Sequence, residues 1–273
     1  MLASFFSLYA VLGCAQEEAF KVEVVGQGKP VLFFPGFACT GAVWDQVVAE
    51  LSKTNKCHVF TFAGFGDIPA IEKPWLPKVK AAVQAYILER NLQQATLIGH
   101  SLGGTLALWL GTEADFDFKQ LIIVDGLPST GALMLPDFDP EQLVYDSPWN
   151  QQLLEMDAQA FEQMAAQMAQ GMCKDRAQQE QIKDWMVQAH RETYVYGYTD
   201  LLKLDLRERL GQIRSPVLLL AATEPYGMEM AKNTYTAQYR QLASYSLQFA
   251  EGASHFIMYD APDWLLEQIR NHL

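Results

Sequence analysis

The sequence predicts an α/β fold with a mostly parallel central sheet and helices on both faces. Short, continuous apolar runs bounded by glycine or proline recur along the chain, which is typical of parallel strands buried on both faces. Segments with helical periodicity lie between these runs, so strand and helix alternate. The alternation stops at residues 126–214 and then resumes, which indicates an insertion within a single fold.

The expected strands follow from their apolar patterns. Phe20–Val25 alternates apolar and polar residues, as a half-buried edge strand does. Continuous apolar runs predict buried strands at 30–34, 57–62, 95–99, 121–124 and 217–222, and a final strand is expected at 245–249. Helices are expected between them at 43–51, 76–92, 102–111, 231–243 and 263–273.

The expected organisation is a core of residues 19–125 and 215–273, interrupted by a helical cap of residues 126–214. Half of the 273 residues are hydrophobic, so a sizeable core can form without disulfides or metals. The cap region is rich in Gln, Met, Ala and Tyr. Within it, 157–172 and 176–190 combine helix-favouring composition with spaced apolar positions, which predicts two helices.

Charge argues against two classes of partner. The formal net charge is −12 and the isoelectric point is about 4.8. Binding to nucleic acid or to an anionic membrane surface needs clustered Lys and Arg, so neither is expected. The four cysteines show no C-x-x-C pair and no metal-ligand spacing, and nothing in the sequence indicates a metal or an organic cofactor.

Residues 1–18 form an expected signal or lipoprotein segment. Met1–Cys14 has no charged side chain, is too short to span a bilayer, and resembles the apolar region of a secretory signal peptide. Val11–Cys14 also resembles a bacterial lipobox, in which Cys14 would carry a lipid anchor. The first residues lack Lys and Arg, and Leu12 is large for its position. The protein is therefore expected to be exported in a bacterium, as a periplasmic, secreted or lipid-anchored protein. The alternative is a cytoplasmic protein that keeps the segment.

Ser101 is the candidate nucleophile. Gly99-His100-Ser101-Leu102-Gly103 is a G-x-S-x-G sequence between an apolar run and a helical pattern. The two glycines remove side chains that would clash as the backbone reverses, so the serine can stand exposed on a strained turn. The backbone N–H of Leu102, at the helix N-terminus, would then point to a developing oxyanion.

His255 is the candidate base, because it follows the last expected strand in a Gly- and Ser-containing loop that could reach Ser101. His100 adjoins the serine, but neighbours on such a turn point apart, so it is expected to line the substrate pocket or to pack in the core. Three histidines remain: His58 in an apolar strand, His190 in the cap and His272 at the C-terminus.

Four motifs, in this order, resemble the α/β-hydrolase superfamily of serine hydrolases with a helical cap, over about residues 20–273. They are Phe33-Phe34-Pro35-Gly36-Phe37, Ala63-Gly64-Phe65-Gly66-Asp67, Gly99-His100-Ser101-Leu102-Gly103-Gly104 and Gly252-Ala253-Ser254-His255-Phe256. The resemblance implies the α/β-hydrolase fold, with the cap inserted after the sixth strand in the family's numbering. It also implies that the backbone N–H of Phe37 is the second oxyanion donor, beside that of Leu102.

The third member of the triad has two candidates. The superfamily's usual position follows the strand ending near Ala222, where this chain has Glu224 in place of the usual aspartate. The superfamily's other position follows the strand after the nucleophile helix, where Asp125 ends an apolar run. An acid is needed there to orient the imidazole and to stabilise the imidazolium. Asp125 is favoured, because its carboxylate would lie beside the serine turn; Glu224 is the alternative.

The expected function is hydrolysis of a small or medium carboxylic ester through an acyl-enzyme on Ser101. Met134, Met164 and Met168 are expected to line an apolar substrate pocket with His100, although methionines at helical spacing also serve as core packing. The same triad would permit lactone, thioester, amide or C–C bond hydrolysis, acyl transfer or perhydrolysis. A non-catalytic binding protein is the rival from a different class, and the sequence specifies no oligomeric state.

Overall fold

The computed structural model describes residues 19–135 and 137–273. The expected signal or lipoprotein segment, with Cys14, lies outside the described residues. None of the described helices is long and apolar enough to cross a membrane.

The described strands form one mostly parallel sheet, which confirms the predicted fold class. Their order is β1-β3-β2-β4-β5-β6-β7, and β1 alone pairs antiparallel, with β3. The strands are β1 (Phe20–Val25), β2 (Lys29–Phe34), β3 (Asn55–Phe62), β4 (Thr96–His100), β5 (Gln120–Val124), β6 (Val217–Ala222) and β7 (Ser246–Ala250). The central strands β4 and β6 are buried along their whole length, as their continuous apolar sequences predict, whereas β1 is a largely exposed edge strand.

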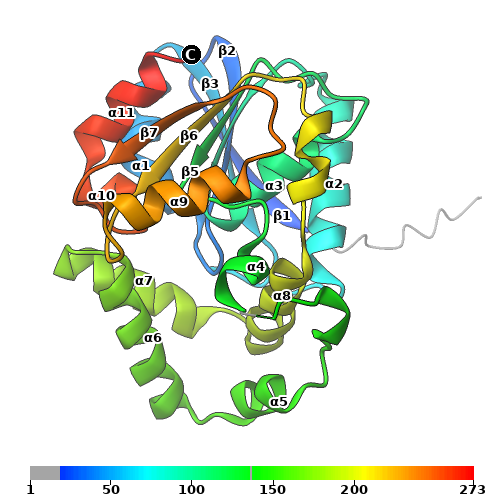
Figure 1. The fold of residues 1–273 in the computed structure, drawn as a ribbon, viewed down its shortest axis with the longest axis vertical. Coiled ribbons are helices and arrows are strands. Elements are labelled where there is room, and N and C mark those ends of the chain that lie inside the picture. Colours follow the sequence, from blue (N-terminus) through cyan, green and yellow to red (C-terminus); the bar gives the residue numbers. More distant parts are fainter. Residues whose placement is uncertain (1–18, 136) are drawn as a thin grey trace, which may run out of the picture.

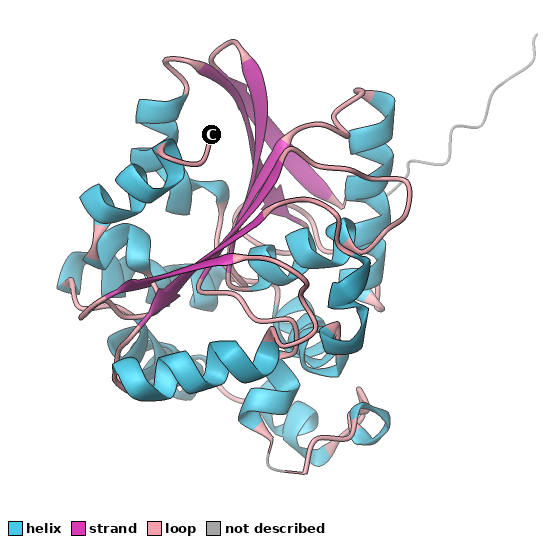
Figure 2. Ribbon diagram, turned by 45° about the horizontal axis from the view of Figure 1, so that its top comes forward, coloured by secondary structure: helices cyan, strands magenta, loops and turns pink. Residues whose placement is uncertain are grey.

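Helices cover both faces of the sheet (Figures 1 and 2). On one face, α1 (Asp45–Leu51) packs against α11 (Pro262–Arg270); on the other, α2 (Trp75–Glu89) packs against α3 (Leu102–Gly111), which lies on β4 and β5. Two further helices complete the core: α9 (Met228–Gln238) on β6, and the short α10 (Ile257–Asp260) before α11.

Helix α9 begins three residues earlier, and ends five residues earlier, than the helix expected at 231–243. Gly227 explains the early start. Its φ of +81° reverses the chain directly before Met228, and its carbonyl accepts the Ala231 N–H at 3.1 Å, which closes the first helical turn.

In the described residues, all regular secondary structure between β5 and β6 is helical. It carries α4 (Thr130–Met134), α5 (Pro148–Glu155), α6 (Ala158–Met172), α7 (Arg176–Gln188) and α8 (Arg191–Lys203), with 3-10 helices at Pro140–Gln142 and Arg207–Gln212. Asp157 and Asp175 cap α6 and α7, the two helices expected here, by accepting N–H groups of their first turns. Helices α4, α5 and α8 were not expected. In the numbering of the described strands this segment follows the fifth, β5, which is the strand expected at 121–124.

Helix α8 joins this helical segment to the core. It packs against α2, where the buried Asp200 accepts the backbone N–H of Leu76 at 3.0 Å and the hydroxyl hydrogen of Tyr145. Leu76 lies in the first turn of α2, where the helix leaves N–H groups without intrahelical partners, so a carboxylate is well placed there. Asp200 therefore fixes α8 against the core. The helices α5 and α6 lie farther from the sheet (Figure 1).

Candidate active site

Ser101 lies on a sharp turn between β4 and α3. Its φ of +52° and ψ of −119° belong to a region that side-chain-bearing residues seldom occupy, and its N–H donates to the Val124 carbonyl at 2.9 Å. The two glycines of the motif make the turn possible. A Cβ at Gly99 would lie 2.1 Å from the Gly103 carbonyl oxygen, and one at Gly103 would lie 2.3 Å from that of Phe34. The sequence thus presents a partly exposed serine at the carboxyl edge of the sheet.

Asp125 and His255 form a close pair beside this turn. The Nδ1–H of His255 donates to Oδ2 of Asp125 at 2.6 Å, and the two side chains are 26% and 16% exposed. Asp125 directly follows β5, so its backbone adjoins Val124, the residue that accepts the Ser101 N–H. The geometry therefore places the carboxylate, the imidazole and the serine turn at one edge of the sheet.

The Asp125 carboxylate is held in its ionised form. Its Oδ1 accepts the Ala222 N–H at 2.9 Å and the Tyr235 hydroxyl at 3.0 Å, while Oδ2 faces His255. Burial alone would raise the pKa of Asp125. The His255 ring and the two other donors outweigh burial, so the pKa of this carboxyl lies below its usual value.

Glu224, the alternative acid, does not reach His255 in this structure. Its side chain is exposed, and its backbone N–H donates to the Ala253 carbonyl at 3.0 Å. The structure thus brings Asp125, and not Glu224, to the imidazole.

His100 supports the loop that carries His255. Its Nε2–H donates to the backbone carbonyl of His255 at 3.0 Å, and the two rings lie 4.6 Å apart. Burial, and the neighbouring His255, lower the pKa of His100 to about 3, so the ring is neutral. His100 was expected to line the substrate pocket or to pack in the core; its side chain is fully buried beneath the turn, so it packs in the core and does not line a pocket.

The backbone around Phe37 and Leu102 fits an oxyanion site. The turn Pro35–Phe37 passes close to Ser101, since a Cβ on Gly36 would lie 3.5 Å from the serine Cβ and 2.7 Å from Nδ1 of His100. Leu102 is the first residue of α3, where an N–H has no intrahelical partner. Within residues 19–135 and 137–273, neither the Phe37 nor the Leu102 N–H has a hydrogen-bond acceptor. Both donors are thus available beside the serine.

The expected pocket methionines make different contacts in the helical segment. Met168 and Met134 accept the hydroxyl hydrogens of Tyr194 and Tyr198, at 3.6 and 3.1 Å. Those tyrosines pack on the ring of Phe37. Met164, one turn before Met168 on α6, is half-buried against the core of the helical segment.

Two supporting residues could not have been found from the sequence. Tyr235 donates to Asp125 across 110 residues. Asp260 accepts the backbone N–H of Ser254 at 2.8 Å and that of Lys174 at 2.9 Å, so it ties the loop of His255 to the end of α6. The Phe256 N–H adds a bond to the Met172 carbonyl at 3.1 Å. Neither residue stands in a local pattern that signals its role; only the fold brings them to these places.

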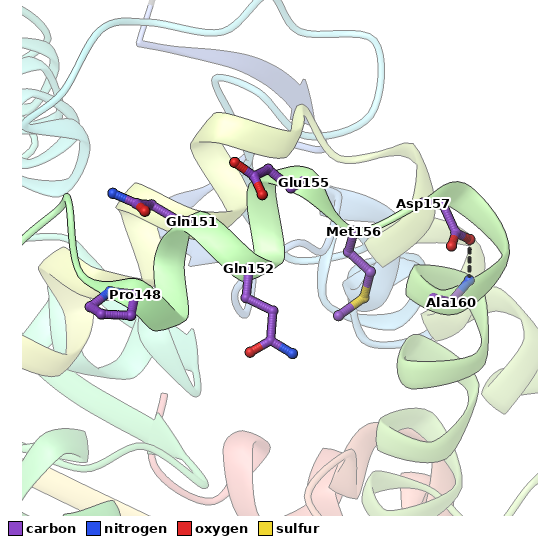
Figure 3. Close-up of a pocket in the computed structure, with 7 residues that line it drawn as sticks. All are labelled: Pro148, Gln151, Gln152, Glu155, Met156, Asp157 and Ala160. Atoms are coloured by element: carbon purple, nitrogen blue, oxygen red, sulfur yellow. Dashed lines mark hydrogen bonds between the residues drawn. The ribbon is translucent and has the colours of Figure 1, made fainter.

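Two surface cavities lie on the helical segment, away from Ser101. One, of about 560 Å³, opens between α5 and the start of α6 (Figure 3), and the other, of about 580 Å³, lies between α6 and α7. Amide and carboxylate side chains such as Gln151, Gln152 and Glu155 surround the first cavity, and the Asp157 cap closes one end. Neither cavity contains a serine or histidine that could act as nucleophile or base. Among the described residues, no group of three or more His, Cys, Asp or Glu is arranged to hold a metal ion.

Comparison with known proteins agrees with this geometry. The model of the alpha/beta hydrolase family matches residues 31–268. The chain is 26% identical over 247 residues to the biotin biosynthesis bifunctional protein BioHC of Cellvibrio japonicus, covering 89% of this chain but only 47% of that protein. It is 29% identical over 199 residues to the pimeloyl-[acyl-carrier protein] methyl ester esterase of Vibrio parahaemolyticus, covering 71% of this chain and 75% of that enzyme.

Solved structures show the same fold at low identity. An esterase from Exiguobacterium antarcticum superposes with a TM-score of 0.77 at 17% identity, over 93% of this chain and 94% of that one. The enol-lactonase from Burkholderia xenovorans superposes with a TM-score of 0.75 at 16% identity, over 93% and 95%. The family match spans most of the chain, and the sheet order and serine turn accord with it. This chain is therefore a member of the alpha/beta hydrolase family.

Proposed function

We propose that the protein is a serine esterase that cleaves a small or medium carboxylic ester through an acyl-enzyme on Ser101. The observation that carries the proposal is the 2.6 Å bond from Nδ1–H of His255 to Asp125, beside the strained serine turn. With Nδ1 protonated, Nε2 keeps its lone pair and can accept the serine proton.

Each step assigns one role to one group. The Ser101 oxygen attacks the ester carbonyl carbon while its proton passes to Nε2 of His255. The carbonyl electron pair moves onto oxygen, where the N–H groups of Phe37 and Leu102 stabilise it. The intermediate then collapses, and the leaving alcohol takes the proton from His255. Water, activated by the same imidazole, hydrolyses the acyl-enzyme and restores the serine.

The acidic charge of the helical segment and the apolar side chains around Phe37 favour an uncharged substrate. Between residues 126 and 214, Asp and Glu outnumber Lys and Arg by fourteen to eight, so this segment disfavours an anionic partner. The rings and thioethers near Phe37 favour an apolar acyl group. Relatives named methyl ester esterases support ester hydrolysis as the bond type.

A panel of p-nitrophenyl esters from acetate to decanoate tests the proposal. We expect wild-type protein to release p-nitrophenol with a preference for short or medium chains, and Ser101→Ala to lose the activity. Ser246→Ala, at an exposed position on β7, is the matched control and should keep it. A folded Ser101→Ala variant with the wild-type rate would overturn the proposal.

A further inference from the structure

Two tyrosines of α8 lie next to the proposed reaction centre. Tyr194 and Tyr198 are one helical turn apart and share a face, and their rings lie 5.5 and 5.3 Å from the ring of Phe37. Phe37 is the residue whose N–H would hold the oxyanion. The two phenol rings therefore lie beside the residue that would hold the oxyanion.

Among the described residues, each of the two hydroxyl groups has a methionine sulfur as its hydrogen-bond partner and no oxygen or nitrogen. Tyr194 donates to Sδ of Met168 at 3.6 Å, and Tyr198 donates to Sδ of Met134 at 3.1 Å. A thioether is a weak acceptor, and a buried phenol usually pairs with oxygen or nitrogen. Tyr194 is only 6% exposed, so water does not readily supply the missing partner there, whereas the contact of Tyr198 with Met134 is open to solvent. An oxygen atom on a ligand would satisfy these donors better than the sulfur atoms do.

One charged side chain, Arg191, lies near the pair. Phe161 packs edge-on against Tyr194. Arg191 stacks on Phe161 at 3.7 Å, but its Nη1 is already bound to the Leu153 and Met156 carbonyls. Burial raises the pKa of both tyrosines, so both remain protonated donors at working pH. Because Arg191 already donates to two carbonyls, the phenols act as the donors to a ligand, and neutral donors suit a neutral acceptor better than a carboxylate.

We infer that Tyr194 and Tyr198 form a subsite for a neutral oxygen on the acyl chain, such as a ketone, ester or ether oxygen. The inference rests on the proposed esterase function and deepens it, since it names the substrate class: esters of acids that carry an internal oxygen acceptor. The two methionines give way to the substrate oxygen, which their unbranched side chains permit.

Tyr196 provides a matched control on the same helix. Its ring packs on Tyr145 at 5.4 Å and under Lys73 at 3.9 Å, so it faces away from Phe37. Tyr196→Phe removes a hydroxyl from α8, as the test variants do, but leaves the subsite untouched.

The test compares p-nitrophenyl heptanoate with its 4-, 5- and 6-oxo analogues. We expect Tyr194→Phe or Tyr198→Phe to lower kcat/KM for at least one oxo ester by roughly 3- to 10-fold relative to heptanoate, the effect of one hydrogen bond. Tyr196→Phe should leave every ratio unchanged. The heptanoate rate serves as the control for folding in each variant.

Two negative results are distinguishable. If wild-type protein hydrolyses heptanoate and all ratios stay within about twofold in both test variants, the subsite is wrong and the esterase stands. If wild-type protein hydrolyses none of the esters, the proposed function fails and the subsite fails with it.

Discussion

Replacing Asp125 with asparagine probes how the carboxylate controls the imidazole. The substitution keeps size and shape but turns one oxygen into an amide group. The side-chain oxygen can still accept from Ala222 N–H at 2.9 Å and Tyr235 Oη at 3.0 Å, the two bonds now made by Oδ1. The amide NH₂ then faces Nδ1 of His255, where Oδ2 now accepts a proton at 2.6 Å.

The expected loss follows from this reversal. Nδ1 must become an acceptor, so the proton moves to Nε2, which can no longer take the proton of Ser101. A wrong tautomer in such a triad costs about 10⁴-fold in kcat, equivalent to about 5 kcal/mol of transition-state stabilisation. Because two of the three bonds to the side chain survive, the free energy of unfolding should fall by no more than about 2 kcal/mol.

Steady-state hydrolysis of a p-nitrophenyl ester measures the first effect, and urea unfolding measures the second. Glu224→Gln is the control; its exposed side chain should leave kcat within about twofold. If Asp125→Asn kept activity within tenfold while Glu224→Gln lost it, the assignment of the acid would be refuted.

Three further predictions concern the frame around the site. Gly36→Ala would place a Cβ 2.7 Å from Nδ1 of His100, so it should lower the free energy of unfolding by about 1–3 kcal/mol and reduce kcat. Gly171→Ala, where the added Cβ has no atom within 4 Å, is the control and should lower neither. Equal urea unfolding midpoints for the two variants would contradict this. Burial lowers the pKa of His58 to about 4 and that of His100 to about 3, so as the pH falls below about 6.5 both histidines take up protons in the unfolded chain before they do so in the folded protein. The free energy of unfolding should therefore be about 2 kcal/mol lower per histidine at pH 5 than well above pH 6.5. Urea unfolding curves that do not change from pH 7 to 5 would argue against this. Asp260→Asn should lower kcat roughly 10- to 100-fold with little change in KM, since it loosens the loop of the base; an unchanged kcat would exclude this role.

The fold was predictable because the core strands carry strong local signals. Runs such as 30–34, 121–124 and 217–222 are apolar on both faces, and the structure has strands there. Helix α8 was missed for a physical reason. Tyr and Thr are frequent in it and have modest helix propensity, so its stability comes from packing against α2 and from the Asp200 contact.

The sequence predicted those residues of the candidate site that directly follow a strand. Asp125 and Ser101 each follow a buried strand, and β4 and β5 are neighbours, so their carboxyl ends meet. The sequence could not reveal the supporting contacts of Tyr235 and Asp260, which depend on how distant segments pack. It also left open whether His100 lines the pocket or packs in the core, because position beside a nucleophile does not tell whether a ring faces the substrate or the core.

Covalent labelling shows directly whether Ser101 is the nucleophile. Folded wild-type protein would be treated with a fluorophosphonate, digested and analysed by mass spectrometry, with Ser101→Ala in parallel. We expect one adduct, on Ser101 in the peptide that spans the β4–α3 turn, and none in the variant. No adduct on folded wild-type protein, or an adduct on a different residue, would contradict it.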